Sequence, residues 1–234
     1  MKKVINILLF LLILISLNGC DRPECEEWGL GKNETAHVSL SRDYDWYIDQ
    51  KNTSDYSYYN CGPSCAVMAA KWADKDFPLS VEDARKTYYN ADNGFEWYLS
   101  SIKYFLFIND IPNVLKYNIS HEAVIECLDE GNIIIVCYNT KDISYNHEPE
   151  LRTGKFYRGH FGHFMILKGY RIVDNKTFYE VYDPNSLNRF YADNTPKGKD
   201  RYYLSDEVIK AARNWDPNYI VVSPKTTPDS DEKG

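Results

Sequence analysis

The chain has 234 residues, 44% of them hydrophobic, and its 34 acidic and 27 basic side chains give a formal net charge of −7 at pH 7. An acidic surface repels phosphate groups, so the composition argues against a nucleic-acid partner and against electrostatic docking on anionic lipid. Because about 200 ordered residues can bury one full hydrophobic core, a single domain is expected.

The first twenty residues carry the pattern of an export signal. Two lysines precede an apolar run over residues 4–17, which has the length of a signal-peptide core and is short for a membrane-spanning helix of roughly 20 residues. The run ends in Leu-Asn-Gly-Cys at residues 17–20, which resembles the lipobox of bacterial lipoproteins. The resemblance implies a signal peptide over residues 1–19 and a lipid on Cys20. The alternatives are an ordinary secretory signal with a chance cysteine, or an uncleaved anchor.

The mature chain would then begin at Cys20. Residues 1–19 hold two basic and no acidic residues, so 25 basic and 34 acidic residues remain and the net charge becomes −9. Membrane attachment is therefore expected from the lipid, in the cell envelope facing the periplasm or the exterior. Five further cysteines remain, so at least one cannot pair within the chain, which marks a candidate reactive thiol. Cys127 and Cys137 lie in apolar segments and are expected to be buried.

The domain itself is expected over residues 46–223. A polar tether is predicted over residues 20–45 and a disordered tail over residues 224–234. Periodicity and capping residues predict helices over residues 64–74, 80–86, 95–107, 120–131 and 205–214, and strands over residues 114–119, 133–137, 164–167, 178–182 and 219–222. Helices come mostly first and strands mostly second, which indicates an α+β domain.

Cys61 is the candidate nucleophile. It stands at the mouth of the first predicted helix and is followed by Gly62 and Pro63. A helix N-terminus stabilises an anion, so a thiol there has a lowered pKa and is populated as thiolate. The glycine would allow a substrate to approach the backbone closely. The alternative is a structural cysteine in a turn, which the surrounding turn residues disfavour because they argue against deep burial.

His163 is the candidate base, since histidine can accept the proton near neutral pH and return it to the leaving group. Two histidines, His160 and His163, lie together, and His163 enters an apolar strand that would fix its backbone. The other three lie in the tether, in a helix and in a loop. A tetrahedral zinc site of Cys61, Cys65, His160 and His163 is the alternative, and two cysteines one helical turn apart make a poor chelate.

Asp183 is the candidate orienting residue for the imidazole. It ends the strand that follows the histidine strand, and neighbouring strand ends can bring His163 and Asp183 together. A plain Asp-Pro turn is the alternative, and Asn185 is the reserve candidate. For the oxyanion of a tetrahedral intermediate, the backbone N–H of Cys61 is one expected donor and the side chain of Gln50 is the other.

These residues together resemble the papain-like cysteine peptidases, and among them the double-glycine leader peptidase family (cysteine peptidase family thirty-nine) and its extracytoplasmic relatives. The likeness lies in Gln50, in the Asn-Cys-Gly-Pro sequence at residues 60–63, in the Gly-His-Phe sequence at 162–164 and in Asp183-Pro184, and it spans roughly residues 45–223. It implies a papain-like fold, with the nucleophile at a helix N-terminus packed on a mostly antiparallel sheet.

The resemblance also implies the same four roles: nucleophile for Cys61, base for His163, orienting residue for Asp183 and oxyanion donor for Gln50. The family's glutamine usually lies six residues before the cysteine, where this chain has Asp55. Gln50 lies eleven before it, so it fits only if residues 51–59 bulge outward. No transporter segment accompanies the domain, so leader cleavage is not the expected task.

The expected function is a lipid-anchored thiol hydrolase that cleaves amide bonds of an extracytoplasmic peptide or protein through an acyl-enzyme. The resemblance implies no cofactor. The same triad serves transpeptidases and amidases, and the residues do not choose among these reactions. The rival class is a non-catalytic binding lipoprotein on the same fold, which the presence of Cys61, His163 and Asp183 disfavours.

Overall fold

The computed structural model describes residues 20–21, 23–53, 56–87 and 96–226. The predicted signal peptide over residues 1–19 lies outside this part of the chain. In the described part the strands form one sheet in the order β1-β2-β5-β4-β8-β3, with β6 paired to β5 and β7 paired to β6. Every pairing in this sheet is antiparallel.

The strands are β1 (Cys20–Asp21), β2 (Asn33–Ser39), β3 (Asn113–Lys116), β4 (Ile133–Asn139), β5 (Gly162–Val173), β6 (Lys176–Tyr182), β7 (Arg201–Leu204) and β8 (Tyr219–Val222). The helices are α1 (Pro23–Glu27), α2 (Cys61–Ala73), α3 (Val81–Thr87), α4 (Leu99–Ile108), α5 (His121–Asp129) and α6 (Ser205–Arg213). Among the described residues, the 3₁₀ turns η1 (Gln50–Asn52), η2 (Ser57–Tyr59) and η4 (Thr140–Asp142) lie between them. None of the helices in the described part combines the length and apolar character needed to cross a bilayer.

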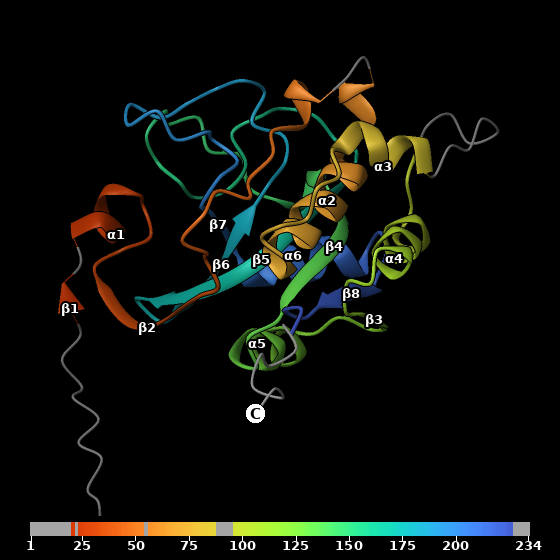
Figure 1. Ribbon diagram of the computed structural model, residues 1–234. Coiled ribbons are helices and arrows are strands. Elements are labelled where there is room, and N and C mark those ends of the chain that lie inside the picture. The colour runs from red at the N-terminus through yellow and green to blue at the C-terminus, as the bar shows by residue number, and fades with distance from the viewer. Residues whose placement is uncertain (1–19, 22, 54–55, 88–95, 227–234) are drawn as a thin grey trace, which may run out of the picture.

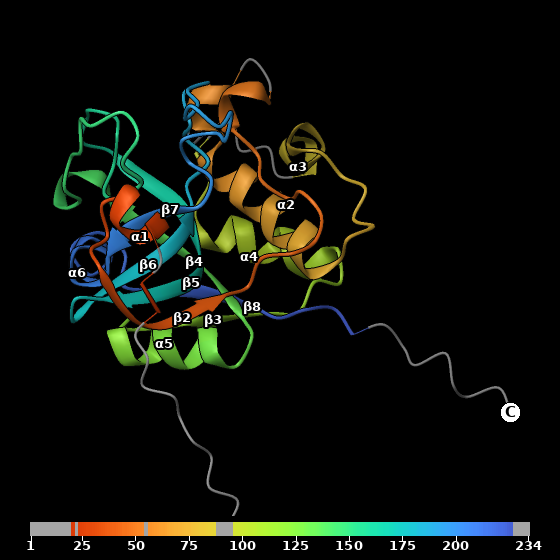
Figure 2. The ribbon, with the colours of Figure 1, turned by 90° about the vertical axis from the view of Figure 1, so that its left-hand side faces the viewer.

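Helices cover both faces of the sheet. Figure 2 shows α2, α3 and α4 on one side of the strands and α6 on the other. Strand β4 lies between them, so successive residues enter opposite cores: Ile133 and Ile135 pack with α2 and α4, whereas Ile134 and Val136 pack with α5 and α6. A strand that is buried on both faces has an unbroken apolar sequence. The apolar run over residues 133–137 predicts a strand for this reason.

Several predicted elements are confirmed with shifted ends. Ser120 caps α5 by accepting the N–H of Ala123, as expected of a serine at that position. Ser205 was predicted to cap α6, but it is the first helical residue, and Leu204 holds the cap position without a side-chain bond. Strand β3 ends at residue 116, because Asn118 adopts a φ of 58° and breaks the extended run predicted to residue 119.

The tether predicted for residues 20–45 is wrong over residues 33–39. These residues form β2, which pairs with β5 through contacts such as Val38 with Tyr170. Residues 35–39 alternate between polar and apolar side chains, and Ala36 and Val38 pack against the core. This alternation was a local signal for a strand, and the tether prediction overlooked it. Similarly, the N–H of Lys225 donates to the carbonyl of Ala73, so the ordered domain continues past residue 223.

Candidate active site

Cys61 is the first residue of α2, where the helix amides lack partners within the helix. Its side chain is half-buried. The backbone N–H groups of Phe164 and Gly62 lie near its sulfur and lower the pKa of the thiol. Helix α2 therefore directs the positive end of its dipole and one of its free amides at this atom, which favours the thiolate.

His163 is the second residue of β5 and is 2% exposed. It pairs with Tyr138 of β4, which holds its backbone on one side of the strand, and the pairing of β5 with β6 begins further along, at Ile166. The side chains of His163 and Cys61 lie close enough for each to shift the pKa of the other. On the far side of the ring, Nε2 lies 2.7 Å from Oδ1 of Asp183. The imidazole therefore lies between the thiol and the carboxylate.

Asp183 follows the last residue of β6. Because β5 and β6 run antiparallel, the start of one lies beside the end of the other, which brings His163 and Asp183 together as the strand order predicted. The carboxylate is fully buried. Its Oδ1 also accepts the N–H of Asn185 at 2.9 Å, and its Oδ2 accepts the hydroxyls of Tyr157 at 2.9 Å and Tyr203 at 2.7 Å. Four donors offset the cost of burying the charge.

Each of the three groups is shifted toward its charged form. Burial raises the pKa of Cys61, but the hydrogen bond and charge of His163, with the two backbone amides, lower it below its usual 9.0. Burial lowers the pKa of His163, but the charge and hydrogen bond of Asp183, and then Cys61, raise it from 6.5 to about 10. Burial raises the pKa of Asp183, and His163 lowers it below its usual range. At neutral pH the arrangement favours thiolate, imidazolium and carboxylate in a row.

Aromatic rings enclose the imidazole. Tyr138, Phe161 and Tyr157 present their rings nearly edge-on to His163, at centroid distances of 5.7, 5.8 and 6.1 Å. Phe161 also stacks on Tyr157, at 5.8 Å. These contacts fix the plane of the imidazole and keep water from its bond with Asp183, so the interaction between the two charges is little screened.

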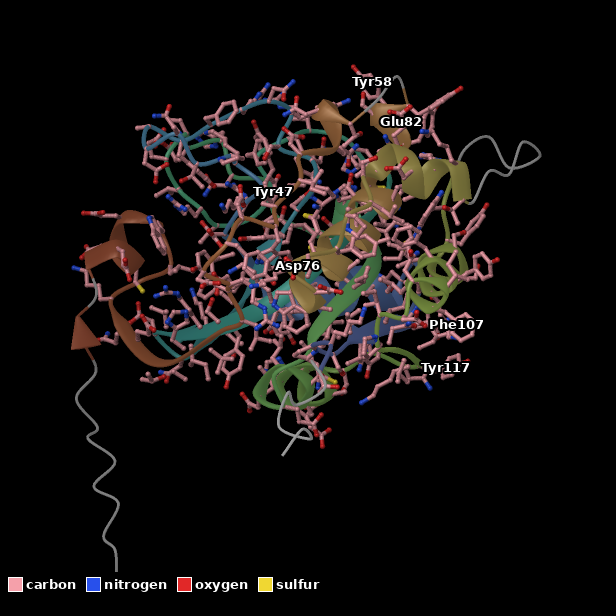
Figure 3. The ribbon with its side chains drawn as sticks, viewed as in Figure 1. Tyr47, Tyr58, Asp76, Glu82, Phe107 and Tyr117 are labelled. Atoms are coloured by element: carbon pink, nitrogen blue, oxygen red, sulfur yellow. The ribbon has the colours of Figure 1, made fainter. Side chains whose placement is uncertain are left out.

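Gln50 is buried at the start of η1, and its backbone N–H donates to the carbonyl of Pro184, next to Asp183. Its Nε2 donates to the carbonyl of Ser57 at 2.9 Å. The described residues between Gln50 and Cys61 bulge outward, with the side chain of Tyr58 79% exposed, as Figure 3 shows at the upper edge of the molecule. This excursion is the one that the eleven-residue spacing requires. The same Nε2 of Gln50 also donates to the carbonyl of Tyr58, at 3.5 Å.

Two glycines of the site serve close packing. A Cβ on Gly62 would lie 2.8 Å from the Cβ of Trp97, so the absence of a side chain on this buried glycine makes room for Trp97. The sequence led us to expect that the glycine makes room for a substrate instead. A Cβ on Gly162 would lie 2.6 Å from the ring of Trp215, which is half exposed. Both tryptophans therefore lie against the backbone next to the nucleophile and the base.

The other thiols contrast with Cys61. Cys25, Cys65, Cys127 and Cys137 are free and buried, as expected for the last two. Burial is the largest cause that raises the pKa of each. Among the cysteine side chains that the structure describes, Cys61 alone has a lowered pKa. His160 is exposed, outside the pair formed by Cys61 and His163.

The zinc alternative finds no geometric support. Cys65 is a residue of α2 whose side chain is fully buried in the hydrophobic core, whereas His160 is exposed. Within the described ranges, no group of three or more histidine, cysteine or acidic side chains is arranged to hold a metal ion.

Sequence reasoning missed the residues that support Asp183. Tyr157 lies in the long connection between η4 and β5, and Tyr203 in β7, a strand that was not predicted. The two adjacent tyrosines, aromatic residues that favour strands, just before a helix were the signal available for β7. Among twenty tyrosines, however, no local pattern distinguishes the two that contact a carboxylate.

No protein-family model matches the chain, and no curated protein matches it significantly. Among solved structures, it is similar to a crystal structure from Bacillus anthracis described as a C39-like peptidase, with a TM-score of 0.55 and 13% identity over 82% of this chain and 100% of that chain. UfSP from C. elegans aligns with 82% of this chain and 35% of its own at 13% identity, and its TM-score of 0.49 is too low to support any conclusion.

At 13% identity the similarity to the bacterial structure concerns the fold. The fold places helices α2 to α4 on one face of an antiparallel sheet, with a cysteine at the first position of α2 and a histidine at the start of the strand beneath it. The chain has the α+β fold of papain-like cysteine peptidases.

Proposed function

We propose that the chain is a cysteine hydrolase that cleaves amide bonds of peptides or proteins through a Cys-His-Asp triad. The observation that carries the proposal is the continuous line from the Cys61 sulfur through the His163 ring to the buried carboxylate of Asp183. In this proposal Cys61 is the nucleophile, His163 the acid and base, and Asp183 the group that orients the imidazole and stabilises its charge.

The first half-reaction begins from the thiolate and imidazolium. The Cys61 sulfur attacks the carbonyl carbon and a tetrahedral oxyanion forms, which the N–H of Cys61 and the amide of Gln50 stabilise by roughly 3 kcal/mol per donor. His163 then gives its proton to the amide nitrogen. The C–N bond breaks, the amine leaves, and a thioester between the substrate acyl group and Cys61 remains.

The second half-reaction releases the acyl group. Neutral His163 takes a proton from a water molecule as the water oxygen attacks the thioester carbonyl. The C–S bond breaks, Cys61 leaves as thiolate and His163 is again imidazolium. An amine in place of water would give transfer, so the transpeptidase reaction uses the same steps.

The proposed location is the cell envelope, through a lipid on Cys20 after removal of residues 1–19. The pattern of two lysines, an apolar run and Leu-Asn-Gly-Cys supports this part of the proposal. The Cys20→Ser variant should move from the membrane to the soluble fraction. If the variant remains membrane-bound and unprocessed like the parent, the lipid anchor is wrong.

The test of the activity compares the purified chain with its Cys61→Ala variant on a defined mixture of peptides, with new termini detected by mass spectrometry. Cleavage by the parent and none by the variant is expected. Adding a peptide amine separates transfer from hydrolysis by the mass of the product. If neither protein cleaves or transfers any peptide while both bind the same ones, the chain is a binding protein and the proposal is wrong.

A further inference from the structure

The side chain of Asn60 points away from the helix that it precedes. Asparagine is among the best N-cap residues, yet Asn60 makes no side-chain cap on α2. Its Oδ1 accepts the Nε–H of Arg85 at 2.6 Å, and its Nδ2 donates to Oγ1 of Thr53 at 2.7 Å. These two bonds hold the amide, which is fully buried, away from the amides at the start of α2.

Arg85 holds both residues that precede the nucleophile. It extends from α3, is 8% exposed, and its Nη2 donates to the carbonyl of Tyr59 at 2.5 Å. Figure 3 shows the place from outside, where Tyr58 of η2 and Glu82 of α3 lie near each other at the upper edge. Burial lowers the pKa of Arg85, and the charge of Cys61 opposes that change.

The same contacts lead to the candidate oxyanion donor. The hydroxyl of Thr53 accepts from Asn60 and donates to the carbonyl of Gln50 at 2.6 Å. A continuous set of hydrogen bonds thus runs from Arg85 through Asn60 and Thr53 to Gln50. These bonds therefore hold Gln50 and Thr53 at one end, and Asn60 at the other end, of the stretch that separates the glutamine from the cysteine.

We propose that Arg85 is a positioning residue for the nucleophile: it holds Asn60 away from the start of α2, so that the free amides and the guanidinium charge serve the Cys61 thiolate. This inference rests on the proposed function and deepens it. Without Arg85, the Oδ1 of Asn60 loses its bond to the guanidinium and can turn to cap α2 in competition with the sulfur, and one positive charge is lost. Both changes raise the pKa of Cys61.

The test measures the rate of iodoacetamide alkylation at Cys61 against pH in the purified full chain, with the modified site identified by mass spectrometry. Arg85→Met removes the charge and the forked donor, and Arg85→Lys keeps the charge alone. Arg42→Met is the matched control, because Arg42 holds the other end of α2, donating from Nε to the carbonyl of Trp72 at 3.1 Å.

Arg85→Met should raise the thiol pKa by about one unit, which slows alkylation about tenfold at pH values below that pKa. Arg85→Lys should give a smaller rise, and Arg42→Met none. The inference is overturned if the thiol pKa of Arg85→Met equals that of the parent, or if Arg42→Met raises it equally. If Arg85→Met does not fold, an unchanged pKa in Arg85→Lys overturns it instead. A parent in which Cys61 alkylates like an ordinary thiol contradicts the proposed function itself.

Discussion

The hydroxyl of Tyr203 provides a quantitative test of how Asp183 is kept charged. Tyr203→Phe removes one of two described donors to Oδ2 of a fully buried carboxylate. A hydrogen bond to a charged group contributes about 1.5–3 kcal/mol to stability. Since one pKa unit corresponds to about 1.4 kcal/mol, the loss should raise the pKa of Asp183 in the folded chain by about one to two units. For a domain of this size the melting temperature should fall by about 3–12 °C.

The pH dependence of this loss has a definite sign. The pKa of Asp183 is lowered in the folded chain, so its stabilising contribution is present above the unfolded pKa and is lost as the pH falls through the folded pKa. Once Asp183 is protonated in both proteins, the tyrosine hydroxyl no longer contacts a charge. The destabilisation by Tyr203→Phe should therefore be constant near pH 7 and shrink as the pH falls through the lowered folded pKa of Asp183.

The assay is urea unfolding of parent and variant between pH 7 and pH 3. Tyr202→Phe is a matched control, because its neighbouring hydroxyl is equally buried but accepts from Nε of Arg171, which stays charged throughout this range. Its destabilisation should not depend on pH. Combining Tyr203→Phe with Tyr157→Phe should cost more than the sum of the two, since Oδ2 then loses both described donors. A Tyr203→Phe loss that still equals its pH 7 value at the lowest pH where both proteins fold refutes this explanation.

Three further predictions concern the base, a buried ion pair and a helix cap. His163→Ala should slow iodoacetamide labelling of Cys61 and peptide cleavage by 100-fold or more, whereas His160→Ala should change both little. Lys168→Met should cost about 3–5 kcal/mol in urea unfolding, because it leaves the buried carboxylate of Glu180 without its cation. Adding Glu180→Gln should restore part of that loss. Ser120→Ala should cost about 1 kcal/mol by removing the α5 cap.

Each of these has a result that contradicts it. If the His163→Ala variant is active and the His160→Ala variant is inactive, the assignment of the base to His163 is wrong. If Lys168→Met and the double variant unfold at the same urea concentration, the Glu180 charge is not the origin of the loss. A Ser120→Ala variant as stable as the parent shows that the cap contributes nothing measurable.

The sequence predicts much of the fold because local patterns dominate there. The apolar run of β4 and the capping serine of α5 are each visible within a few residues. The order of cysteine, histidine and aspartate was also visible, because antiparallel strands bring the start of β5 next to the end of β6.

The remaining features depend on contacts between distant residues. Strand β2 exists because β5 extends to residue 173 and offers it a partner about 135 residues further along the chain. The support of Asp183 by Tyr157 and Tyr203 likewise joins three separate segments. Arg85 reaches Asn60 across 25 residues of chain. No spacing or periodicity within one segment encodes such pairs.

The most direct test of the account is the site at which a peptidyl vinyl sulfone attaches to the full chain at mildly acid pH, mapped by mass spectrometry. Such a compound forms a stable thioether with a thiolate, and the Cys61 pKa is lowered while burial raises the pKa of Cys25, Cys65, Cys127 and Cys137. The account predicts one adduct, on Cys61, that His163→Ala greatly slows. An adduct on Cys65 in its place, or attachment to Cys61 at the same rate without His163, would contradict it.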